Sequence, residues 1–99
     1  MDIRIQSINF NADQKLLDYV EKRVSKAATF FDRITGIDVY LKFDSAHSQI
    51  KEKTVEMKVL VPGSTIFASE NSLNFEEAVD LAMESLKRQL TKHKEKIQN

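Results

Sequence analysis

Residues 37–43 read IDVYLKF, the clearest strand signal in the sequence. Their apolar side chains occupy the odd positions, an alternation typical of a half-buried β-strand. The same alternation returns at 54–61, after a polar stretch at 44–52. A Pro-Gly pair at 62–63 predicts a turn into a fourth strand at 65–70. We therefore predict three successive strands that pair as an antiparallel meander.

Outside this meander, the sequence predicts one more strand and two amphipathic helices. Residues 2–8 alternate as a first strand, and a helix is expected over about 12–29, with Asn11 as its N-cap and Gln14 completing a capping box. The last helix has Asn74 as its N-cap and reaches nearly to the C-terminus. The apolar stripes of these helices are Leu16, Leu17, Val20, Val24, Ala27 and Phe31 in the first, and Phe75, Val79, Ala82, Met83, Leu86, Leu90 and Ile97 in the last.

The order strand, helix, three strands, helix predicts how the elements pack. A strand–helix–strand beginning favours parallel pairing of the first two strands. Each helix has one apolar stripe, so both are expected on one face of one sheet. We predict the α+β class: a two-layer sandwich with a four-stranded mixed sheet, forming one domain over residues 1–99. The side chains expected on the other face of the sheet are Tyr40, Lys42, Thr54, Glu56 and Lys58.

Composition argues against most enzymes. The 99 residues include no cysteine, which excludes a disulfide scaffold, a cysteine zinc site and a thiol nucleophile. Two glycines are too few for a phosphate-binding loop, and His47 and His93 lack metal-ligand spacing. Residues 1–10 have no apolar core of a signal peptide. We expect a cytoplasmic protein that is not an enzyme, with no cofactor, metal, membrane segment or small-molecule substrate.

A formal net charge of zero hides a strong charge asymmetry. Residues 70–84 contain five acids and no base, whereas residues 87–99 contain five bases and one acid. The helix dipole favours this order of charges. Helical spacing also aligns basic residues opposite the apolar stripes. On the first helix these are Lys15, Lys22 and Lys26, with Arg23 on the flank. On the last helix they are Arg88, Lys92 and Lys96, with Lys87 and Lys94 on the flank. Lysine and arginine, with Tyr19 among them, suit phosphate contacts and base stacking in RNA binding.

Other interpretations of the same residues stay open at this point. A charged outer face is the ordinary state of a solvated helix. A protein-binding adaptor could use a sheet edge or the acidic half of the last helix. A hydrolase around His47 and Ser48 lacks an acid that would orient the histidine. His93, Phe30 and Phe31 are predicted to be packing residues.

Four segments of the chain resemble the ribosome hibernation-promoting factors, a family that includes the ribosome-associated inhibitor and light-repressed proteins and is sometimes labelled sigma-54 modulation proteins. The segments are FFDRI at 30–34, IFASE at 66–70, EAVD at 77–80 and LKRQLTKHK at 86–94. They span nearly the whole chain in order, and the run 88–94 is the most specific. Because the sequence ends at Asn99, it looks like the short form, without the C-terminal domain by which long members pair ribosomes.

This resemblance implies a fold related to the double-stranded-RNA-binding domain. It also implies a translational regulator that binds the small ribosomal subunit between head and body, over the sites of messenger RNA and of the A- and P-site transfer RNAs. Such proteins hold idle ribosomes inactive in stationary phase or stress. The implied partners are ribosomal RNA and ribosomal proteins. The implied RNA-binding residues are Lys22, Arg23, Lys26, Lys87, Arg88, Lys92, Lys94 and Lys96.

Overall fold

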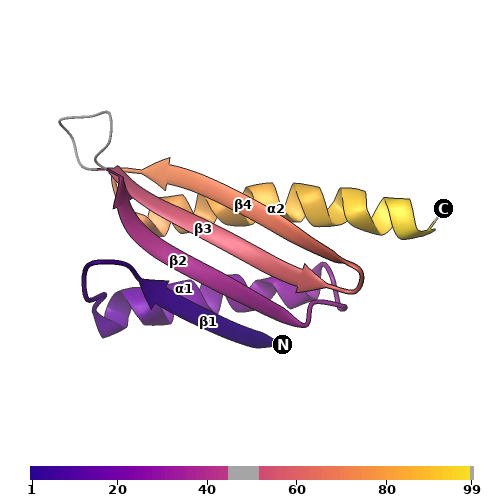
Figure 1. The fold of residues 1–99 in the computed structure, drawn as a ribbon, viewed down its shortest axis with the longest axis horizontal. Coiled ribbons are helices and arrows are strands. Elements are labelled where there is room, and N and C mark those ends of the chain that lie inside the picture. The colour runs from indigo at the N-terminus through magenta and orange to yellow at the C-terminus, as the bar shows by residue number, and fades with distance from the viewer. Residues whose placement is uncertain (45–51, 99) are drawn as a thin grey trace.

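The computed structural model describes residues 1–44 and 52–98 and has the predicted order of elements (Figure 1). The strands are β1 (Asp2–Ser7), β2 (Gly36–Asp44), β3 (Glu52–Val61) and β4 (Ser64–Ser72). The helices are α1 (Gln14–Ser25), a short 3₁₀ helix η1 (Lys26–Thr29) and α2 (Phe75–Gln98). Most of the polar connection expected at 44–52, with His47 and Ser48, lies outside the described residues.

One mixed sheet and two helices form two layers, which confirms the predicted α+β class (Figure 1). The strand order is β1-β2-β3-β4, with β1 parallel to β2 and the other neighbours antiparallel. By this pairing β1 and β4 run in the same direction, and each is followed by a helix that runs back along the sheet. Both helices therefore run in the same direction and end at the same end of the molecule (Figure 1). The likeness to a double-stranded-RNA-binding domain stays a prediction.

The core lies between the sheet and the two helices. Val39 of β2 faces Met57 of β3 in the sheet register, and both are fully buried, as is Leu86 of α2. Burying an aliphatic side chain of this size contributes about 1.5–3 kcal/mol. Each helix buries a single stripe and leaves its other side polar. Within the described residues, neither helix is long and apolar enough to cross a membrane.

The start and the end of the first helix differ from the prediction. Asp13, and not Asn11, is the N-cap of α1, and its Oδ1 accepts a 2.8 Å hydrogen bond from the backbone N–H of Leu16. Asn and Asp cap helices about equally well, so their order in the sequence did not determine which would act. The α-helix also ends at Ser25, because residues 26–29 tighten into a 3₁₀ turn. The prediction for α2 is confirmed, since Asn74 Oδ1 accepts from the N–H of Glu77 at 2.7 Å.

One side chain on the sheet face away from the helices is buried, although the sequence predicts it to be exposed. Thr54 is only 5% exposed, although its strand position puts it on the open face. It lies on the inner strand β3, directly between Lys42 of β2 and Asn71 of β4. We attribute its burial to these longer neighbours, which flank a short side chain. Lys42 is also fixed there by an ion pair with Glu56 at 3.2 Å.

Candidate nucleic-acid interface

The eight basic residues predicted to bind RNA are concentrated toward the C-terminal ends of the two helices. Because the helices run in the same direction, these ends lie at the same end of the molecule (Figure 1). Arg23 is half-buried and the other seven side chains are exposed. The exposed seven are Lys22, Lys26, Lys87, Arg88, Lys92, Lys94 and Lys96.

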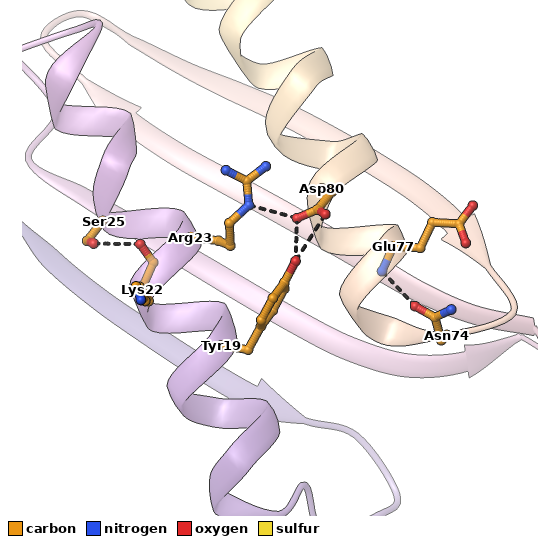
Figure 2. Close-up of polar contacts among 7 residues, drawn as sticks. All are labelled: Tyr19, Lys22, Arg23, Ser25, Asn74, Glu77 and Asp80. Carbon is orange, nitrogen blue, oxygen red and sulfur yellow. Dashed lines mark hydrogen bonds and ion pairs between the residues drawn. The ribbon is translucent and has the colours of Figure 1, made fainter.

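A polar cluster joins the two helices and fixes Arg23. Figure 2 shows the side chains of Tyr19 and Arg23 extending from α1 to Asp80 on α2. The Nε of Arg23 donates to Asp80 Oδ1 at 2.7 Å, and the hydroxyl of Tyr19 donates to the same carboxylate at 2.8 and 3.0 Å. Tyr19 is therefore half-buried between the helices, with its hydroxyl bonded to Asp80. Its part in base stacking stays a prediction. It lies on the flank of α1 that faces α2.

The cluster keeps each of its three groups in one charge state at neutral pH. Burial acts to raise the pKa of Asp80, but the hydrogen bonds from Arg23 and Tyr19 outweigh it and leave that pKa below its usual value. The hydrogen bond to Asp80 raises the pKa of Arg23. Burial, followed by the bond to Asp80, raises the pKa of Tyr19. A carboxylate, a guanidinium and a neutral phenol therefore hold α1 against α2.

Arg23 keeps donors for a further partner. Only its Nε is bonded to Asp80, and the two terminal nitrogens of the guanidinium point away from that carboxylate (Figure 2). The residue can therefore position the basic end of α1 and still donate to a phosphate. Its role in RNA binding stays a prediction.

The second half of α2 presents cations along two shallow grooves. Lys87, Arg88 and Lys92 line a groove of about 390 Å³ on its outer side. Lys92 and Lys96 line another, of about 550 Å³, that reaches Ile66 on β4. Within 1–44 and 52–98, none of these four cations has an acidic group within 4.0 Å. Such unpaired cations are suited to neutralising phosphates.

A third cleft, of about 710 Å³, lies where the chain leaves η1, and residues 28–33 and Lys94 line it. Phe31 is buried with its ring centroid 5.7 Å from that of His93, which confirms both as packing residues. Phe30 packs against the core as predicted, but it is only half-buried and also borders the cleft. Lys87 Nζ lies 5.9 Å from its ring centroid. Arg33 also lines the cleft, and the helical charge pattern does not single it out because it lies beyond the end of the helix.

One of the two sheet edges, that of β4, is partly closed by a side chain from α2. Gln89 Nε2 donates to the backbone carbonyl of Phe67 on β4 at 2.8 Å. An added strand would need that outward carbonyl for its own ladder. This contact counts against strand addition at the middle of β4.

Comparisons with known proteins give matches over nearly the whole chain. A family model described as "Sigma 54 modulation protein / S30EA ribosomal protein" matches residues 3–98. A ribosome hibernation promoting factor of Pseudomonas putida KT2440 is 30% identical over 99 residues, covering 100% of this chain and 92% of its own. One of Azotobacter vinelandii is 33% identical over 96 residues, with 97% and 85% covered. The solved structure of a ribosomal subunit interface protein from Coxiella burnetii superposes with a TM-score of 0.82 at 29% identity, covering 95% of this chain and 98% of that one.

Proposed function

The chain belongs to the sigma 54 modulation protein / S30EA ribosomal protein family, and we therefore propose that it is a ribosome hibernation factor. It binds the small ribosomal subunit in the channel that messenger RNA and transfer RNA use. There it holds idle ribosomes inactive in stationary phase or stress. The relatives named ribosome hibernation promoting factor, and the solved subunit interface protein, support this proposal.

The observation that carries the proposal is the gathering of exposed cations at one end of two parallel helices. Seven of the eight predicted RNA-binding side chains are exposed there, and Arg23 ties their two helices together through Asp80. Phosphate contacts of this kind position a protein on RNA without reading sequence. They suit a factor that must recognise one shaped channel rather than one base sequence.

The mechanism is steric exclusion and involves no chemical reaction. A two-layer domain with a rigid core occupies the channel, and phosphate contacts hold it there. The C-terminal turns of α2 extend past the end of the sheet, so their cations can approach RNA without obstruction by the strands (Figure 1). In this account residues 1–99 act as a single ribosome-binding domain in the cytoplasm.

A protein-binding adaptor remains the alternative of a different class, with less support. The contact of Gln89 with Phe67 occupies one carbonyl of the β4 edge that such an adaptor would use. The acidic half of α2 is also less available to a protein partner, because Asp80 is already bonded to Arg23 and Tyr19 of α1.

Competition with transfer RNA tests the proposed site. The purified chain is mixed with isolated small subunits, and separately with large subunits, and pelleted through a sucrose cushion. We expect co-pelleting with small subunits that falls as transfer RNA is added. Binding that transfer RNA leaves unchanged would place the protein elsewhere on the ribosome.

A further inference from the structure

The cleft at the end of η1 has the features of a nucleotide site. Its volume of about 710 Å³ lies within the ~300–1,000 Å³ typical of small-ligand pockets. Its lining comes from the end of η1, the residues that follow it, and Lys94 of α2. These segments lie at the end of the molecule where both helices end (Figure 1). The cleft is therefore continuous with the surface assigned to RNA.

Consecutive phenylalanines give this cleft one aromatic wall. Phe31 is 5% exposed in the core, and its neighbour Phe30 packs against the core but is only half-buried and lines the cleft. The exposed part of an aromatic ring can stack on a base of any identity. Lys87 Nζ lies 5.9 Å from the Phe30 centroid, at the outer limit of about 6 Å for a cation–π contact. This weak contact can give way when a base approaches.

The charges around the ring suit a phosphodiester. Arg33 and Lys94 line the cleft, both are exposed, and neither has an ion-pair partner in the part of the chain that the structure describes. A guanidinium binds phosphate oxygens in a bidentate manner, and an ammonium adds a point charge. Asp32 also lines the cleft. Its carboxylate suits the amino group of a base rather than a phosphate.

We propose that this cleft receives one unpaired nucleotide of ribosomal RNA, with its base stacked on Phe30 and its phosphate held by Arg33 and Lys94. The inference rests on the proposed function and adds to it a defined contact beyond phosphate neutralisation along the helices. Unpaired nucleotides are the usual targets of aromatic stacking in RNA recognition.

The absence of cysteine allows a direct test of position. Thr29→Cys, at the cleft, provides a single attachment point for a photo-crosslinker, and Ser69→Cys on β4 provides a control on the open face of the sheet. With small subunits bound, we expect the label at 29 to crosslink to one discrete stretch of ribosomal RNA and the label at 69 to give no such product. Equal crosslinking from both positions would overturn the proposal.

Substitution tests the chemistry of the contact. Phe30→Leu keeps an apolar side chain but loses the ring, and we expect it to bind small subunits about five-fold or more weakly. Phe30→Tyr keeps the ring and should bind like the wild type. Arg33→Glu should weaken binding, whereas Lys58→Glu, the same charge change on the open sheet face, should not. Melting curves identify any variant that fails to fold.

The possible failures are distinguishable. If the cleft variants bind like the wild type while Arg88→Glu weakens binding, the nucleotide site is wrong and the proposed function stands. If the folded wild-type chain does not bind small subunits at all, the proposed function itself fails. If millimolar adenosine monophosphate perturbs the Thr29 amide resonance and the cleft variants still bind ribosomes normally, the ligand is a free nucleotide and not ribosomal RNA.

Discussion

The Nε of Arg23 on α1 lies 2.7 Å from Oδ1 of Asp80 on α2, and the Tyr19 hydroxyl completes the contact (Figure 2). This pair joins a basic residue of one helix to the acidic half of the other. Part of the acidic charge of α2 is therefore paired within the fold, where it helps to fix the angle and spacing of the two helices. The other basic side chains lie exposed on α1, η1 and α2, and the contact between Arg23 and Asp80 helps to fix these helices relative to each other.

Asp80→Asn should reduce the stability of the fold. The variant leaves Arg23 without its ionic partner, but both side chains are partly exposed, at 33% and 43%, so solvent screens the loss. We expect the free energy of unfolding to fall by about 1 kcal/mol. Urea denaturation at pH 7 measures this change, and a fall equal to that of a surface control such as Glu84→Gln would contradict it.

The same variant predicts a pH dependence. The pKa of Asp80 is lower in the folded chain than in the unfolded one, so its ionised form stabilises the fold. This contribution is complete above the unfolded pKa of about 3.9 and is lost as the pH falls through the lower folded value. The difference in unfolding free energy between wild type and Asp80→Asn should therefore stay constant from pH 7 to about 5 and narrow in stronger acid. A difference that grows in acid would reverse the assigned sign.

Asp13→Ala should destabilise α1, because its carboxylate caps the N–H of Leu16. The expected loss is about 1 kcal/mol of unfolding free energy. Asn11→Ala is the matched control and should change stability by less than about 0.5 kcal/mol. Thermal melting of the two variants side by side measures this, and a larger effect at Asn11 would restore it as the cap.

Leu90→Ala should destabilise the protein strongly, because the side chain is fully buried between α2 and the sheet. The expected cost is about 2–5 kcal/mol. Leu81→Ala on the same helix removes the same atoms from a position that is 36% exposed, and should cost about 0.5 kcal/mol or less. Similar losses at both positions would mean that α2 is rotated from its described orientation.

The double variant Arg88→Glu with Lys92→Glu should lose most of its affinity for small subunits and keep its fold. Both side chains are exposed on the outer side of α2. Circular dichroism and co-sedimentation measure the two properties separately. Lys53→Glu with Lys58→Glu makes the same change in charge on β3, away from both helices, and serves as the control. Equal loss in both pairs would indicate a response to net charge alone.

Much of the fold could be predicted because its signals are local and periodic. Alternation along residues 37–43 and 54–61 gave the inner strands, and single apolar stripes placed both helices on one face. The N-cap was missed because Asn11 and Asp13 are equivalent by residue type. Thr54 was missed because its burial depends on the cross-strand neighbours Lys42 and Asn71, which no local pattern specifies.

The sequence predicts which basic residues each helix exposes, but not the contacts that form between the two helices. Helical spacing places Arg88 and Lys92 outward, as the structure does. It cannot show that Arg23 and Tyr19 turn toward Asp80, more than fifty residues away. Nor can it show the cleft beside Phe30, because that space depends on how the chain leaves η1 against α2.

The salt dependence of binding to isolated small ribosomal subunits is the most decisive test of a phosphate-binding surface on the two helices. The wild-type chain is pelleted with subunits across a series of salt concentrations, next to the Arg88→Glu and Lys92→Glu variant. We expect log affinity to fall linearly with log salt, by about 0.7–0.9 for each phosphate contacted, and the variant to have a shallower slope. Affinity that hardly changes with salt, or a folded chain that does not pellet at low salt, would contradict a phosphate-binding surface.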